Sequence, residues 1–265
     1  GGLPRARSRG VGGRGARRSL PAGVPDDAPP NPPGGGGAPV AARDAVVNPS
    51  VLPGPLVAPT PGTRSLPGDI AAMDWSTLQQ AVASCEACGL CKSRTNTVFG
   101  VGDTQPRWLV VGEAPGENED LRGEPFVGQA GQLLDNMLKA IGLSRTATGA
   151  KAVYIANVLK CRPPANRNPQ PGEMLQCEPY LQRQVELLQP KIILALGRIA
   201  AQALLSATVP DVASTPLGKL RGQVHRYLGV PVVVSYHPAY LLRTPQDKAK
   251  AWIDLCLALD VAGRT

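Results

Sequence analysis

Residues 108–116 read WLVVGEAPG, a short apolar run that leads directly into a loop containing glycine and proline. Comparable runs rich in Val, Ile and Leu follow at residues 153–156, 192–196 and 232–235. Segments with helical periodicity lie between or after these runs, at residues 132–141, within 173–188, at 198–205 and at 247–259. Short buried strands that alternate with helices indicate an α/β fold, with a parallel sheet covered by helices on both faces.

The loops after these strands are the expected location of a functional site. Ligands bind to parallel sheets beyond the carboxyl ends of the strands. The unusual loops of this chain follow the strands directly, at residues 112–116, 157–164 and 237–243. A further helix is expected to begin at Ser76, which has the spacing of a capping box with Gln79.

The first quarter of the chain differs in composition from the rest. Of the 265 residues, 1–68 hold 14 Gly and 14 Pro and no Phe, Trp or Tyr. Such a segment buries too little apolar surface to offset the entropy of ordering it. We therefore expect a disordered extension at residues 1–68 and one folded domain at residues 69–265.

The charge of the chain is also concentrated in this extension. The net charge is +8, and residues 1–68 carry eight Arg against three Asp. A basic chain suits a polyanionic partner, although most of the excess lies outside the expected domain. No apolar run approaches the roughly 20 residues that cross a membrane, so no membrane partner is expected.

Six cysteines stand at residues 85, 88, 91, 161, 177 and 256. Cys85 and Cys88 form a C-x-x-C pair, and Cys161 and Cys177 lie far downstream, which makes a site with four thiolates plausible. The spacing is not that of a zinc ribbon; an iron–sulfur cluster tolerates scattered ligands better because it spans several ångströms. Cys91 continues the series and competes as a ligand, whereas Cys256 suits a buried free thiol.

Three side chains in or beside these loops each have a structural interpretation and a ligand-binding interpretation. Glu113 follows the first strand in a glycine-containing loop, which is either an ordinary turn or a carboxylate in a cleft. Phe126 is one of two Phe in the chain and serves either as a core residue or as a stacking surface. Asn157 ends the second strand, where it either forms a turn or reads one donor and one acceptor on a base edge.

The last loop contains the stronger functional candidate among the two histidines. His237 stands where the final strand leaves the sheet, a position that favours a functional role over a core role. Leu241 and Leu242, followed by Arg243, are either the edge of the core or an apolar wedge that enters a DNA duplex beside a phosphate contact.

Taken together, these motifs resemble the family 4 uracil-DNA glycosylases, the iron–sulfur members of the uracil-DNA glycosylase superfamily. The resemblance runs from about Cys85 to Asp260. The motifs that carry it are GEAPG at 112–116, PFVG at 125–128, AGQLL at 130–134, Asn157, KCRPP at 160–164, ALGR at 195–198 and HPAYLLR at 237–243.

This resemblance implies a three-layer α/β/α sandwich with a short, mostly parallel central sheet. It implies a [4Fe–4S] cluster held by Cys85, Cys88, Cys161 and Cys177, with a structural role. It also implies a monofunctional enzyme that flips uracil out of DNA and hydrolyses its N-glycosidic bond, leaving an abasic site for base excision repair. The expected partner is uracil-containing DNA, and the protein is expected to be a cytoplasmic monomer.

The resemblance also implies roles for the residues of the loops. Phe126 would stack on the flipped base and Asn157 would hydrogen-bond its edge, which cytosine cannot match. His237 would stabilise the leaving uracil anion, and Glu113 would position or deprotonate the water or stabilise the cationic sugar. Leu241 would fill the vacated stack and Arg243 would contact the DNA.

Two positions and one loop of the chain differ from relatives of this family. Ala114 and Gly116 line the expected substrate pocket, but the best-known uracil glycosylases have an Asp and an aromatic residue there. A related branch bonds covalently to DNA through a His in an Arg-rich loop, and residues 162–171 contain no His. Two other classes compete with the enzyme: a non-catalytic iron–sulfur DNA-binding module and an electron-transfer protein.

Overall fold

The computed structural model describes residues 68–264, so the expected disordered extension lies outside the described residues except for Gly68. The strands are β1 (Val101–Gly102), β2 (Trp108–Gly112), β3 (Val153–Asn157), β4 (Ile192–Leu196), β5 (Val224–Tyr227) and β6 (Val230–Ser235). The α-helices are α1 (Trp75–Ala83), α2 (Glu117–Arg122), α3 (Gln129–Ala140), α4 (Pro171–Leu188), α5 (Arg198–Leu205), α6 (Leu217–Leu220), α7 (Pro238–Arg243) and α8 (Lys248–Arg264). Short 3-10 turns lie at Ile70–Ala72, Gly89–Lys92, Gly149–Lys151, Pro164–Asn166 and Pro245–Asp247.

The strands form one mixed sheet in the order β1-β3-β2-β4-β6-β5. The four central strands β3, β2, β4 and β6 are parallel, as the sequence predicts, and the edge strands β1 and β5 are antiparallel. The carboxyl ends of the parallel strands therefore meet at one edge of the sheet. There Gly112, the last residue of β2, pairs with Asn157, the last residue of β3.

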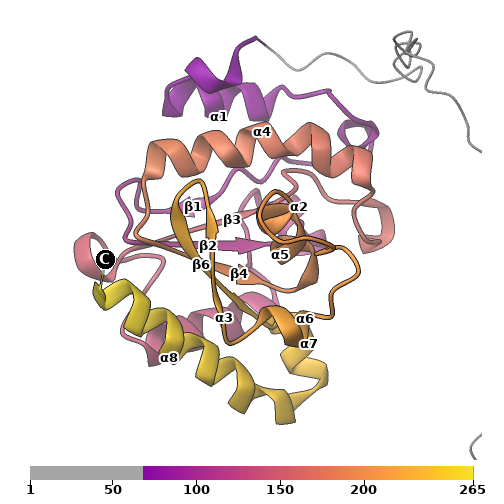
Figure 1. Ribbon diagram of the computed structural model, residues 1–265. Helices are drawn as coiled ribbons and strands as arrows, with labels where there is room; N and C mark the ends of the chain where they lie inside the picture. Colours follow the sequence, from indigo (N-terminus) through magenta and orange to yellow (C-terminus); the bar gives the residue numbers. More distant parts are fainter. Residues whose placement is uncertain (1–67, 265) are drawn as a thin grey trace, which may run out of the picture. The chain divides into compact units, whose positions relative to one another are not determined.

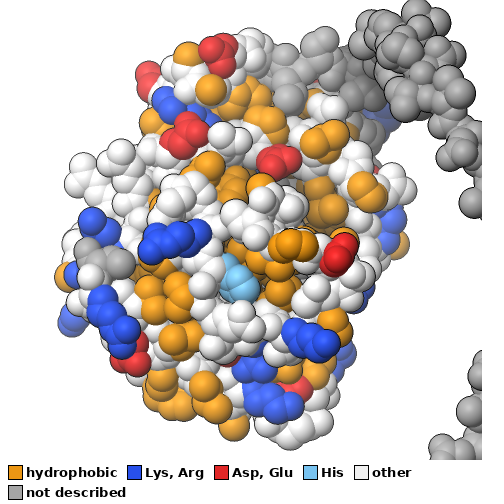
Figure 2. Space-filling model, in the orientation of Figure 1, with side chains coloured by type: hydrophobic (Ala, Val, Ile, Leu, Met, Phe, Trp, Pro, Cys, Tyr) orange, Lys and Arg blue, Asp and Glu red, His pale blue; other side chains and the backbone are white. Residues whose placement is uncertain are grey.

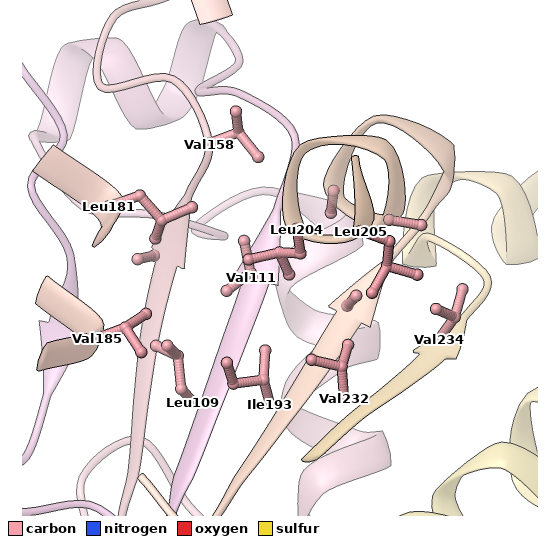
Figure 3. Close-up of a cluster of buried hydrophobic side chains, with 14 of the residues drawn as sticks. Leu109, Val111, Val158, Leu181, Val185, Ile193, Leu204, Leu205, Val232 and Val234 are labelled. Atoms are coloured by element: carbon pink, nitrogen blue, oxygen red, sulfur yellow. The ribbon is translucent and has the colours of Figure 1, made fainter. Parts of the chain in front are cut away.

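The sheet lies between layers of helices (Figure 1), and alternate residues of the central strands pack against different layers. Leu109, Val111 and Ile193 pack with residues of α4 and α5 on one face, which Figure 3 shows in detail. Trp108 and Val110 point to the other face and pack with α3 and α8. All residues of β2, β3 and β4 are buried, as expected for strands covered on both sides. The fold is thus the three-layer α/β/α sandwich that the sequence predicts.

Helix α1 packs on the outer side of α4 through a separate apolar cluster that includes Leu78 and Tyr180. It begins two residues earlier than the capping-box spacing predicts. The N-cap is Asp74, whose carboxylate accepts a hydrogen bond from the main-chain N–H of Thr77 at 2.8 Å. An ionised N-cap carboxylate also interacts favourably with the helix dipole, which explains why Asp74 rather than Ser76 ends the preceding loop.

The elements without a sequence prediction are short or lie at the edges. Strand β1 has two residues. Strand β5 is the last strand of the sheet, beside β6, and its residues are alternately exposed and half-buried. Helix α7 occupies a segment expected from the sequence to be a loop. Pro238 stands at the first position of this helix, where proline is tolerated. Within residues 68–264, no helix combines the length and the apolar character needed to cross a membrane.

Candidate active site

A pocket opens beyond the carboxyl ends of the parallel strands. Seven of the residues that the sequence predicts for a site line it: Glu113, Ala114, Gly116, Phe126, Asn157, His237 and Arg243. They come from the loop after β2, the end of β3 and the segment after β6, which the chain brings together through the parallel pairing of these strands.

The loops after β2 and β3 are joined by main-chain hydrogen bonds. The N–H of Val158 donates to the carbonyl of Gly112 at 3.0 Å, and the N–H of Leu159 donates to the carbonyl of Glu113 at 3.1 Å. These bonds hold the main chain of Glu113 in a fixed place relative to the end of β3. The Glu113 side chain is half-buried, and burial raises the pKa of its carboxyl group.

Asn157 is buried at the bottom of the pocket. Its Oδ1 atom is buried and accepts no hydrogen bond from any residue that the structure describes. Gly112 makes space for this side chain: a Cβ atom at position 112 would overlap Oδ1 of Asn157 and lie 2.6 Å from Cζ of Phe126. A buried oxygen without a partner is costly, so this atom indicates a ligand that offers a hydrogen-bond donor.

The main chain around Phe126 is held in an unusual conformation. Phe126 has φ of 56°, in the left-handed region that residues other than glycine rarely adopt. Arg145 donates hydrogen bonds to the carbonyls of Pro125 and Phe126 at 2.9 and 3.0 Å. Glu119 accepts from the N–H groups of Val127 and of the following glycine at 2.9 and 3.2 Å. Phe126 is therefore placed by two charged side chains on either side of it.

His237 lies against Phe126 and is the N-cap of α7. The two rings stack with centroids 5.4 Å apart and an interplanar angle of 28°. Nδ1 of His237 accepts a hydrogen bond from the N–H of Ala239 at 3.2 Å. Burial and the nearby cation of Arg243 lower the pKa of His237 to about 4, although Glu119 acts in the opposite direction.

This geometry determines the protonation state of the imidazole. A main-chain N–H can only donate, so Nδ1 of His237 carries no proton. With its pKa near 4, the ring is neutral at physiological pH and carries its single proton on Nε2. His237 is thus a neutral hydrogen-bond donor.

The segment after His237 corrects one sequence-based interpretation. Leu241, the expected wedge, is 1% exposed and points into the protein, so in this structure it is not available to enter a duplex. Its neighbour Leu242 is 41% exposed. The reason is the helical turn of α7, which places adjacent residues about 100° apart on the helix. Arg243 is exposed and lines the pocket, as expected.

Five of the cysteines line a second pocket. Its walls include Cys85, Cys88, Cys161 and Cys177, the four predicted ligands, and also Cys91. Arg94 donates to Sγ of Cys161 at 3.2 Å. Cys256 lies on α8 and does not line this pocket. The structure thus brings together five of the six thiols.

The donor set of this cysteine pocket fits an iron–sulfur cluster. Burial raises the pKa of Cys161 to about 11 and that of Cys177 to about 12, so without a metal these thiols hold their protons. Among the described residues, no three or more Cys, His, Asp or Glu side chains converge as they would on one metal ion. A cluster spans several ångströms and takes thiolates that are farther apart than the ligands of one ion.

Three residues to which the sequence assigns no role line these pockets or hold their residues in place. Glu119 stands three residues after Gly116, the N-cap of α2, a capping-box spacing that could have identified it. Arg145 lies in a loop after α3 and carries no local signal. Lys160 is 2% exposed between the two pockets, and burial lowers its pKa to about 8.

Comparisons with known proteins agree with this geometry. The Uracil DNA glycosylase superfamily matches residues 99–258, more than half of the chain. The Type-4 uracil-DNA glycosylase of Archaeoglobus fulgidus is 47% identical over 169 residues, 62% of this chain and 81% of the relative. That of Thermotoga maritima is 42% identical over 174 residues, 65% of this chain and 85% of the relative.

A more distant group matches a smaller part of the chain. The Type-5 uracil-DNA glycosylase of Pyrobaculum aerophilum is 34% identical over 150 residues, 53% of this chain and 64% of that relative. The higher identities and coverage belong to the type-4 proteins. This chain therefore belongs to the uracil-DNA glycosylase superfamily and, within it, to the type-4 uracil-DNA glycosylases.

Proposed function

We propose that this protein removes uracil from DNA by hydrolysis of the N-glycosidic bond. The observation that carries the proposal is the buried Oδ1 of Asn157, which has no partner among the described residues and lies in the pocket with Phe126. Uracil offers a donor at N3–H and an acceptor at O4. Cytosine presents the opposite pattern, so a fixed Asn157 amide that accepts from N3–H discriminates between the two bases.

The base must leave the stack to reach this pocket, which costs a few kcal/mol. The ring of Phe126 provides a flat apolar surface for the flipped uracil, and the left-handed conformation of its main chain keeps that ring beside Asn157. Gly112 leaves the space between these two side chains open. Stacking and hydrogen bonding then orient the glycosidic bond towards the loops after β2 and β6.

His237 stabilises the leaving group. As the bond breaks, negative charge accumulates on the uracil ring while the sugar becomes cationic. The neutral imidazole donates from Nε2 to the developing oxyanion at O2, and its orientation is set by the hydrogen bond from Ala239 to Nδ1. A neutral donor is already in the required state at physiological pH and needs no prior protonation.

Glu113 acts on the opposite side of the reaction. Its carboxylate is half-buried in the pocket, where it orients or deprotonates the attacking water or stabilises the cationic sugar. The main-chain bond from Leu159 to the Glu113 carbonyl fixes the start of the loop that carries it. Ala114 provides no second carboxylate, so Glu113 is the acidic group we assign to this role.

The acid limb of kcat/KM is expected to report Glu113 and not His237. Burial raises the pKa of Glu113. As the pH falls, its carboxylate is therefore protonated at a higher pH than that of an ordinary glutamate. His237, with a pKa of about 4, remains neutral through that range. Glu113→Gln should be slower by about 10²- to 10⁴-fold and lack this limb, measured as uracil release against pH. An acid limb unchanged in Glu113→Gln would contradict the assignment.

We further propose that Cys85, Cys88, Cys161 and Cys177 hold a [4Fe–4S] cluster. The support is the shared pocket of these thiols, three of which are buried, with Arg94 beside Cys161 as a compensating cation. The cluster would supply structural order to the loops after β3 and before α4. The monomeric state and the cytoplasmic location stay predictions.

The wedge is assigned to Leu242. It is exposed on α7. His237 is the N-cap of this helix, and Arg243, its last residue, lines the pocket. Figure 2 shows Lys and Arg side chains spread over the lower half of one face of the protein, a distribution suited to a phosphate backbone. An apolar side chain that enters the stack next to such a contact keeps the flipped nucleotide from returning.

Leu242→Ala is expected to lower excision from duplex DNA by roughly 10-fold, the loss of one apolar contact of about 1.5 kcal/mol, and to spare single-stranded DNA. The matched variant is Leu241→Ala. Because Leu241 is buried, this change should lower the free energy of unfolding by about 2–5 kcal/mol and affect both substrates alike. Parallel excision assays with the two DNA forms measure the difference. If Leu241→Ala lowered excision from duplex DNA only and Leu242→Ala affected both substrates alike, Leu241 would be the wedge.

The proposed reaction is tested with an oligonucleotide that contains a single U and with matched strands that contain C or T. Free uracil should appear only from the first. The strand should break only after treatment with alkali, because none of the described lysines lines the pocket as a Schiff-base nucleophile. Binding of DNA without release would favour the DNA-binding module. Reversible reduction of the cluster with neither binding nor release would favour electron transfer.

A further inference from the structure

Lys160 lies between the two pockets, three residues after Asn157 and next to Cys161. Its side chain is buried, and the Nζ group donates to the main-chain carbonyl of Asn157 at 2.8 Å and to Oε1 of Gln184 at 2.6 Å. The same lysine lines the cysteine pocket. One side chain therefore contacts the residue that reads the base and the cavity that holds the thiols.

The charge of Lys160 is not balanced by its hydrogen-bond partners. Both acceptors, an amide oxygen of Gln184 and the carbonyl of Asn157, are neutral. A buried ammonium requires compensating negative charge. The candidate groups are the sulfurs of Cys177 and Cys161, which line the same pocket as Lys160. Cysteines become thiolates when they ligate a metal, so an occupied pocket supplies the missing charge.

The surroundings leave Lys160 little freedom to move. Its carbonyl accepts from the N–H of Val98 at 2.8 Å, and Gln184 donates from Nε2 to the carbonyl of Phe99 at 3.0 Å. Gln184 itself is buried in the middle of α4. The ammonium group is thus held at a fixed point beside Asn157.

We propose that Lys160 is a positioning residue that couples the cysteine pocket to Asn157. Its ammonium group balances the ligated thiolates and at the same time holds the main-chain carbonyl of the residue that reads uracil. Loading of the cluster then orders the base pocket, and loss of the cluster loosens it. The proposal rests on the proposed function, both for the role of Asn157 and for the cluster that the thiolates ligate.

The test compares the iron-loaded protein with Lys160→Met, which retains the volume of the side chain but removes the charge and the donor. Removal of an outer partner of a metal site typically costs 10- to 100-fold in affinity or activity, and we expect about this loss in both iron retention against a chelator and kcat/KM for uracil. The reduction potential of the cluster should become more negative, because a nearby cation is lost. Amide hydrogen exchange at residues 157–160 should accelerate.

A double-mutant cycle tests whether Lys160 acts through Asn157. If it does, Lys160→Met should lower excision far less in an Asn157→Ala background than in the parent. The matched control is Lys191→Met, because Lys191 is exposed at the opposite edge of the sheet, before β4. That variant should leave iron retention, potential and excision unchanged.

Additive losses in the cycle, or iron retention and potential equal to those of the parent, would overturn the proposal. If Lys160→Met does not fold, Gln184→Leu removes one acceptor of the same ammonium group and should give smaller changes of the same kind. A parent protein that keeps its iron but releases no uracil would overturn the proposed function. Iron retention, potential and hydrogen exchange would then still decide the role of Lys160.

Discussion

His237→Ala is expected to lower kcat for uracil release by about 10²- to 10³-fold, the usual effect of removing one donor that stabilises a developing anion. KM should change little, because the charge at O2 develops only in the transition state. The N–H of Ala239 occupies Nδ1 of His237, so Nε2 carries the proton and is the donor. Single-turnover kinetics on the oligonucleotide with one U would measure the effect.

His225→Ala is the matched control for this prediction. His225 lies on the edge strand β5, where its Nε2 contacts the carbonyl of Leu220, and it does not line the pocket. This variant should keep the kcat of the parent. A loss in His237→Ala confined to KM would show that the imidazole binds the substrate without stabilising the leaving group.

Gly112→Ala is expected to lower kcat/KM by at least about 100-fold, since a displacement of about 1 Å in an active site can cost that much. The added Cβ would overlap Oδ1 of Asn157 and lie 2.6 Å from Cζ of Phe126, closer than real Cβ contacts. One of the two side chains must then move into the space that the base needs. Uracil release at subsaturating substrate measures the effect.

The control for Gly112→Ala is Gly218→Ala, because a Cβ at position 218 would meet nothing within 4 Å. It should keep the excision rate of the parent. Thermal unfolding of both variants separates a blocked pocket from a damaged core. Full activity in a folded Gly112→Ala variant would show that the base does not bind between Asn157 and Phe126.

The parallel sheet was predictable because buried strands have a strong local signal. Residues 108–111, 153–156, 192–196 and 232–235 are continuous apolar runs, and each lies within an observed parallel strand. Parallel strands in turn bring their carboxyl ends together, so the sequence alone placed Glu113, Asn157 and His237 at one edge. Strands β1 and β5 lack this local signal, because β1 has two residues and β5 alternates exposed and half-buried residues.

The placement of individual side chains was harder to predict because it depends on tertiary contacts. The expected wedge was Leu241, but one helical turn decides that Leu242 is the exposed residue. Arg145 lies about 20 residues from the carbonyls it contacts, and no local pattern signals that pairing. A lysine is ordinarily exposed, and no local pattern indicates that Lys160 is buried beside the cysteine pocket.

The most direct test of this account is release of free uracil from a labelled oligonucleotide with one U, by the iron-loaded parent and by a Glu113→Gln, His237→Ala double variant. Both proteins should bind the DNA and show the visible absorbance of the cluster. The account predicts release by the parent and none above background by the double variant. Equal release by both would contradict the assignment of the reaction to the pocket formed by Glu113, Phe126, Asn157 and His237.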